Sequence, residues 1–100
     1  IRLTGDRVGV EVRDGFSQLR ATYLRAQQTI RLADLAEQVA DGERRRFAVG
    51  AAGVNVLTLN LREEAAAEAR LRVIAALVDF QIAIAAYRAA VGEDRLPIQR

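Results

Sequence analysis

The side chains of this 100-residue chain that could do chemistry are almost all carboxylates and guanidiniums. Thirteen Asp and Glu residues accompany fifteen basic residues, all of them Arg, and the sequence contains no Cys, His, Met, Trp or Lys. Without Cys and His, the chain has no thiol nucleophile, disulfide, imidazole base or ordinary zinc ligand. No pair of its carboxylates has a supporting feature that would make it an acid–base couple. We therefore expect no catalytic residue, no metal and no cofactor.

The arginines could also bind anions, and one dense cluster consists of Arg44, Arg45 and Arg46. Asp41 precedes this cluster at a spacing that suits ion pairs with Arg44 or Arg45 along one helix. The formal net charge is only +2, whereas nucleic-acid-binding proteins carry a concentrated basic face. We interpret the cluster as a solvated helix face and expect no nucleic-acid partner.

The apolar segments near the C-terminus are short. The longest uninterrupted runs, residues 73–78 and 82–87, are six residues each and are split by Asp79. A membrane-spanning helix needs ~20 mostly apolar residues. We therefore expect that this chain does not itself span a membrane. Because it begins at Ile1 rather than Met, we also expect it to be a piece of a longer protein.

These side chains must be positioned by helices. Residues 6–48 contain no Pro and are rich in Ala, Arg, Leu, Glu and Gln, which favour helix. Apolar residues recur at helical spacing, which predicts a helix over about residues 5–48 that packs along another helix. Thr4 or Asp6 could cap its start. The predicted stripe weakens at Glu37 and comprises Val8, Val12, Phe16, Leu19, Tyr23, Ala26, Ile30, Ala33 and Ala40.

The helical pattern breaks at about residues 49–54, which predicts a turn. Gly50 suits a left-handed position after the end of a helix. Gly53 or Asn55 could begin the next helix. This is the only convincing turn in the sequence before its C-terminal end.

A second helix is predicted over about residues 55–92, with Gly92 as its C-cap and an irregular tail, residues 93–100, that contains Pro97. From Leu71 onward this helix is apolar over more than one face, so we expect more than one neighbour to bury it. Its predicted stripe comprises Leu57, Leu61, Ala65, Ala69, Ile74, Leu77, Ile84, Tyr87 and Val91.

Two long helices joined by a short turn predict an all-α fold, an antiparallel coiled-coil-like hairpin. Residues equally distant from the turn should then meet: Phe16 with Tyr87, Tyr23 with Phe80, Leu19 with Ile84, and Ile30 with Ile74. Near the turn the facing residues are small or charged, which predicts a thin contact there. Because one stripe must offset ~1.5 kcal/mol of conformational entropy per ordered residue, we expect the hairpin to assemble into a larger helical bundle or α-barrel.

Several motifs follow one another in a recognisable order. Residues 11–19 read EVRDGFSQL, residues 46–50 RFAVG, residues 54–57 VNVL, residues 60–63 NLRE, residues 76–81 ALVDFQ and residues 87–92 YRAAVG. Their order and separation resemble the opening, the tip and the returning helix of the last periplasmic hairpin of TolC-like outer-membrane efflux proteins. The resemblance covers about residues 8–92.

The resemblance implies a function in transport without catalysis. Proteins of that family are homotrimers with a β-barrel in the outer membrane of Gram-negative bacteria and a helical tunnel through the periplasm. The tip of the hairpin would dock on a periplasmic adaptor protein, and through it on an inner-membrane pump. The docking residues implied are Val49, Gly50, Ala51, Ala52, Gly53 and Val54.

The resemblance also implies polar residues after the tip that would line the lumen, namely Asn55, Thr58, Asn60, Arg62 and Glu63. Some members of the family carry Asp residues here, which form a constricting acidic ring. This sequence has no acidic residue between Asn55 and Glu63, so an acidic gate is not expected.

Other readings of the same residues stay open. A coiled-coil or four-helix-bundle module for oligomerisation or signalling would need the helical stripe but not the motifs. The hairpin of an adaptor protein also has two long helices, although neither flank of this chain shows the strand pattern that would surround it. Asn60, Arg62 and Glu63 could form a solvated helix face, and Asp79 could point outward or bond a neighbouring hairpin.

Overall fold

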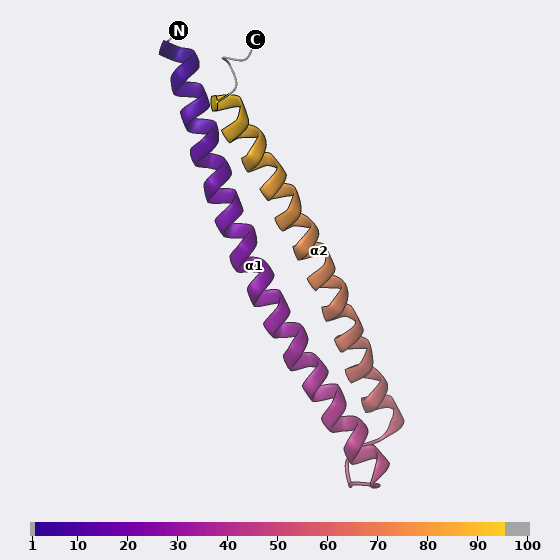
Figure 1. Cartoon of the computed structure of the whole chain (residues 1–100). Helices are drawn as coiled ribbons and strands as arrows, with labels where there is room; N and C mark the ends of the chain where they lie inside the picture. Colours follow the sequence, from indigo (N-terminus) through magenta and orange to yellow (C-terminus); the bar gives the residue numbers. More distant parts are fainter. Residues whose placement is uncertain (1, 96–100) are drawn as a thin grey trace. The chain divides into compact units, whose positions relative to one another are not determined.

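The computed structural model of this chain describes the backbone of residues 2–95 and the side chains of residues 9–92. The described residues form two α-helices and no strand: α1, Arg2–Ala48, and α2, Val56–Arg95. A turn of residues 49–55 joins them (Figure 1). The all-α class and the antiparallel helical hairpin with two long helices are thereby confirmed.

The helices extend beyond the predicted bounds at their outer ends. Because α1 begins at Arg2, Thr4 and Asp6 lie within the helix and do not cap it. The predicted end of α2 at Gly92 is wrong, since the helix continues to Arg95 and Gly92 lacks the positive φ of a left-handed cap. Glu93, Asp94 and Arg95 can continue a helix once Gly92 has helical dihedrals. Residues 96–100 of the predicted tail lie outside the described residues.

The chain divides into two compact units, each of which contains a segment of both helices. The base unit comprises residues 1–25 and 76–100, and the tip unit comprises residues 26–75. We call the line of contact between α1 and α2 within each unit the seam.

In the base unit the seam consists of small side chains beside aromatic ones. Thr22, Ala76 and Ala83 are buried. The Thr22 hydroxyl lies 2.9 Å from the Gln18 carbonyl and 3.0 Å from the Leu19 carbonyl, so its polar group is satisfied within its own helix.

In the tip unit the seam is made of alanines, with Ala26, Ala40, Ala66 and Ala69 buried. Along each helix the less exposed positions recur at alternating steps of three and four, the spacing of a coiled coil. On α1 these positions are Val12, Gly15, Leu19, Thr22, Ala26, Thr29, Ala33, Ala36 and Ala40. On α2 they are Ala66, Ala69, Val73, Ala76, Phe80, Ala83, Tyr87 and Ala90.

The predicted stripes are therefore correct in spacing but partly wrong in position. Phe16, Tyr23 and Ile30 are 54%, 47% and 47% exposed, although the sequence pattern placed them in the contact. Ala, Gly and Thr occupy most of the α1 positions at which the two backbones approach, so Phe16, Tyr23 and Ile30 lie at the edges of the seam. The same correction applies on α2 to Leu57, Leu61, Ala65, Ile74 and Leu77, which are all exposed.

Candidate functional site

The turn between the helices ends α1 in a defined motif. Gly50 has a φ of 71°, in the left-handed region that glycine adopts without strain. The Gly50 amide donates to the Phe47 carbonyl at 3.1 Å, and the Ala51 amide donates to the Arg46 carbonyl at 2.9 Å. This pair of bonds is a Schellman motif, which satisfies the free carbonyls of the last helical turn. The predicted C-cap role of Gly50 is confirmed.

Asn55 caps the start of α2. Its Oδ1 accepts a bond from the Thr58 amide at 2.8 Å and lies 3.1 Å from the Thr58 hydroxyl. The Asn55 carbonyl accepts the Leu59 amide at 3.0 Å. These are the bonds of an N-cap residue, which satisfies otherwise free amides of the first turn. The turn is thus closed at both ends, with Gly53 as a second positive-φ glycine at 84°.

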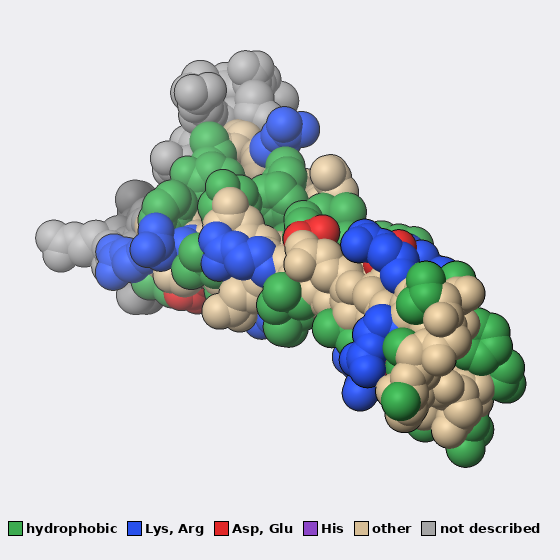
Figure 2. Space-filling view, turned by 90° about the horizontal axis from the view of Figure 1, so that it is seen from below, with side chains coloured by type: hydrophobic (Ala, Val, Ile, Leu, Met, Phe, Trp, Pro, Cys, Tyr) green, Lys and Arg blue, Asp and Glu red, His purple; other side chains and the backbone are tan. Residues whose placement is uncertain are grey.

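The tip, which we define as residues 49–55 with the adjoining helix ends, presents apolar side chains without charge. From Phe47 to Leu61 the sequence has no charged residue, and Arg46 and Arg62 flank this stretch. Viewed from the turn end of the molecule, hydrophobic side chains lie open at the surface with arginines beside them (Figure 2). The exposed large residues here are Phe47, Val49, Val56, Leu57 and Leu61.

The predicted docking residues all lie in this turn, but they differ in exposure. Val49 is 79% exposed, more than the other large apolar residues of the described chain. Ala52 and Gly53 are also exposed, whereas Ala51 and Val54 are half-buried. Residues 49–54 carry no polar side chain, so these six residues could contact a partner only through apolar side chains and backbone groups.

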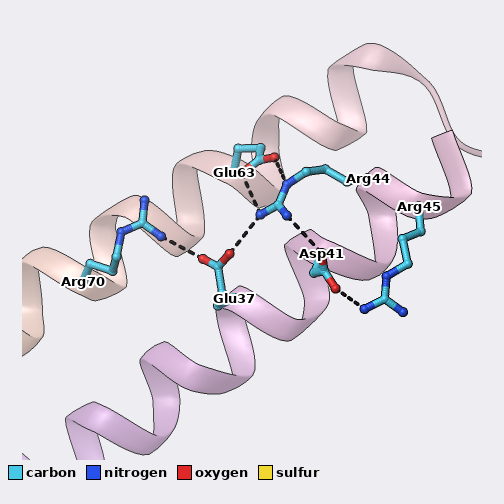
Figure 3. A network of polar contacts seen from close by, with 6 residues as sticks. All are labelled: Glu37, Asp41, Arg44, Arg45, Glu63 and Arg70. Carbon is cyan, nitrogen blue, oxygen red and sulfur yellow. Dashed lines mark hydrogen bonds and ion pairs between the residues drawn. The ribbon is translucent and has the colours of Figure 1, made fainter. Parts of the chain in front are cut away.

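A network of ion pairs lies next to the tip, in the tip unit, and we call it the Arg44 network (Figure 3). Its members are Glu37, Asp41, Arg44, Arg45, Glu63 and Arg70. Arg44 Nε donates to Glu63 Oε2 at 2.5 Å, Nη1 to Asp41 Oδ1 at 3.1 Å, and Nη2 to Glu37 Oε2 at 2.9 Å. The bonds from Glu63 and then Glu37 raise the pKa of Arg44 above its ordinary value.

The outer members of the network add one contact along α1 and one between the helices. Arg45 pairs with Asp41 one turn back on α1, as the sequence spacing predicted for Asp41. Arg70 of α2 donates to Glu37 Oε1 of α1 at 2.7 Å. Two contacts therefore join α1 to α2, Arg44 with Glu63 and Arg70 with Glu37. Sequence reasoning missed both, although part of the signal was present. Glu37 interrupts the apolar stripe, and Arg70 lies three residues, about one helical turn, beyond Ala67, which is as far from the turn as Glu37.

The polar residues expected along a lumen are used in different ways. Asn55 and Thr58 are engaged in the N-cap of α2. Glu63 turns to Arg44 of its own hairpin. Asn60 and Arg62 are exposed, and they remain the two members of the set that carry no bond within the described side chains of residues 9–92.

In the base unit, aromatic residues line an open groove on one side of the seam. Phe16 and Tyr87 have ring centroids 6.3 Å apart, and Tyr23 and Phe80 have centroids 5.7 Å apart. Both pairings were predicted from their distance to the turn and are confirmed. The lining residues are Phe16, Leu19, Arg20, Tyr23, Phe80, Ile84, Tyr87 and Arg88.

The apolar surface of α2 extends beyond this groove. Leu71, Ile74, Leu77, Val78 and Ile82 are all exposed. Within Val56–Gly92 this helix is long and apolar enough to cross a membrane by length and composition, and little of that stretch is buried. The expectation from uninterrupted runs missed this, because alanines on both sides of Asp79 keep the average apolar. Asp79 and Arg88 are among the ionisable residues of Val56–Gly92, and ionisable residues are costly inside a bilayer.

The described residues contain no group of three or more His, Cys, Asp or Glu side chains that could hold a metal ion. The tip offers apolar contacts, and the Arg44 network beside it offers ion pairs. No protein-family model, curated protein or solved structure matches this chain.

Proposed function

We propose that this chain is a periplasmic hairpin of a TolC-like, trimeric outer-membrane efflux conduit of a Gram-negative bacterium. In this function the tip docks on a periplasmic adaptor protein, which joins the conduit to an inner-membrane pump. The hairpin is a structural and transport component, without catalysis, and its parent protein carries the barrel that crosses the outer membrane.

The observation that carries the proposal is the tip itself. A turn closed by the Gly50 motif and the Asn55 cap holds Val49 out from the ends of two long helices. Exposed apolar residues without charge over this length are unusual for a turn in water, because turns favour polar residues. The motif order in the sequence supports the same function.

The outward apolar residues support the assembly that the proposal requires. In an α-barrel each hairpin is flanked by others, so its large side chains are covered by neighbours rather than by its own second helix. Leu71, Ile74 and Ile82 are 65%, 58% and 63% exposed in the single chain. Contact with neighbouring hairpins would remove this surface from water, at about 25 cal/mol per Å² of apolar area.

The proposal is tested by binding at the tip. The probe is the periplasmic adaptor protein encoded beside the parent gene, and its affinity for this chain is measured by biolayer interferometry. We expect Val49→Asp to abolish binding and Val39→Asp, an equally apolar but lateral site on α1, to leave it unchanged. Equal binding by both variants, or a parent gene without a signal peptide, barrel strands and a second related hairpin, would refute the proposal.

A four-helix-bundle module for oligomerisation or signalling is the second candidate. The alanine seam favours it independently of the motifs, since the seam leaves large apolar side chains exposed on both helices. Such a module needs no docking surface at its turn. A parent gene that encodes a kinase, receptor or regulatory domain would select this candidate over the conduit.

A further inference from the structure

The packed seam of the tip unit ends before the tip. Ala40 is fully buried and Ala66 is 1% exposed. Among the described residues 41–65, which include the turn, none is buried. The last turns of α1 and the first turns of α2 are therefore not held together by a hydrophobic core.

Arg44 crosses between the helices in this stretch (Figure 3). Its guanidinium contacts both carboxylate oxygens of Glu63 on α2, at 2.5 and 3.4 Å, while it also reaches Asp41 and Glu37 on α1. A planar guanidinium with five N–H donors can serve three carboxylates in fixed directions. Among the members of the network, only Arg44 contacts all three of these carboxylates.

The remaining members strengthen this assignment. Glu37 receives a second contact from Arg70, so the carboxylate on α1 is held from both helices. All six side chains are only half-buried or exposed, which leaves their ion pairs open to salt. The strength of the network therefore depends on ionic strength, unlike that of a buried core.

We propose that Arg44 is a positioning residue that clamps the last turn of α1 to the start of α2 and so fixes the geometry of the tip. The clamp loosens as ionic strength rises. The inference rests on the proposed function only where the tip is treated as a docking surface. The clamp itself joins two helices of the same chain, so it can be measured without a partner.

The experiment uses the distance between two spin labels. Because the chain has no cysteine, Phe47→Cys on α1 and Asn60→Cys on α2, both exposed sites, provide unique attachment points beyond the clamp. Double electron–electron resonance then gives the distribution of distances. We expect a narrow distribution at low salt, and a clearly broader one in the same chain carrying Arg44→Gln.

Matched variants separate the clamp from general effects of charge removal. Arg46→Gln removes the same charge two residues along α1, at a site without a carboxylate partner among the described side chains, and should leave the width unchanged. Glu63→Gln should broaden the distribution as Arg44→Gln does, and Arg44→Lys should broaden it only in part. At ~1 M NaCl the Debye length is about 3 Å. The distance distribution of the chain with the intact network should then broaden, whereas that of the Arg44→Gln chain should not broaden further.

The outcomes are exclusive. An unchanged width in both Arg44→Gln and Glu63→Gln would overturn the clamp, and so would equal broadening by Arg46→Gln. Helix content by circular dichroism should stay constant, since a variant that unfolds throughout would show a global loss instead of a local one. A narrow distance distribution in a chain that does not bind the adaptor would refute the proposed function but would still support the Arg44 clamp.

Discussion

Gly15 of α1 lies directly against Tyr87 of α2. A Cβ built at Gly15 would lie 3.4 Å from Tyr87 Cδ1 and 3.6 Å from Tyr87 Cα. The two backbones of the base unit therefore approach at a site where only a very small side chain fits, beside the ring pair of Phe16 and Tyr87. This contact shows one way in which the seam is built: a glycine on one helix faces a large side chain on the other.

The size of the side chain at residue 15 should set the stability of the base unit. Gly15→Ala adds a methyl at ordinary van der Waals distance and removes a helix-interior glycine, so we expect stabilisation of up to about 1 kcal/mol. Gly15→Leu must push α1 away from Tyr87 and should cost about 1–3 kcal/mol. Urea unfolding followed by circular dichroism measures both. Equal stability of the two variants would show that the helices do not approach here.

Substitution by alanine should have opposite effects on stability at a glycine of the tip and at a glycine within a helix. Gly50 has positive φ, so Gly50→Ala forces a left-handed alanine and should cost about 1–2 kcal/mol. A Cβ built at Gly42, within α1, has no other residue's atoms within 4 Å beyond its own helix turn, so Gly42→Ala should stabilise by about 1 kcal/mol. Thermal unfolding of the two variants checks the signs. A stabilising Gly50→Ala would contradict the Schellman turn.

Asn55 should matter through its cap rather than through its polarity. Asn55→Ala removes the acceptor for the Thr58 amide and should cost about 1 kcal/mol. Asn60→Ala is the matched control, because Asn60 is exposed and lies within the helix. Amide hydrogen exchange should rise in the first turn of α2 for Asn55→Ala alone. Equal protection in both variants would argue that Asn55 does not cap the helix.

The sequence predicted the fold more completely than it predicted the contacts between the two helices. Helix-forming residues without Pro and a single Gly-containing break were enough for two helices and one turn. The aromatic pairs followed from distance to the turn, since Tyr23 and Phe80 could meet only in an antiparallel hairpin. The continuation of α2 beyond Gly92 was not predicted, because a glycine near the end of an apolar stripe usually indicates a C-cap. In the structure the residues after Gly92 continue the helix to Arg95.

The sequence pattern placed the wrong residues in the seam because many of the contact residues are alanines. Hydrophobicity favours Phe16 and Ile30 as contact residues over Ala26 and Thr22, but close approach of two backbones rewards small size instead. The Arg44 network was missed because its members were considered within one helix. Only the pairing of α1 with α2 reveals that Glu63 and Arg44 meet.

We expect other helices to cover the large outward side chains of α2 in the assembled protein. Multi-angle light scattering of this chain at micromolar concentration tests it most directly. We predict concentration-dependent association that is abolished by Ile74→Glu with Ile82→Glu, while Asn60→Glu with Gln81→Glu, on exposed polar sites, leaves it intact. A compact monomer throughout the micromolar range, or association unchanged by the Ile74 and Ile82 substitutions, would contradict the account.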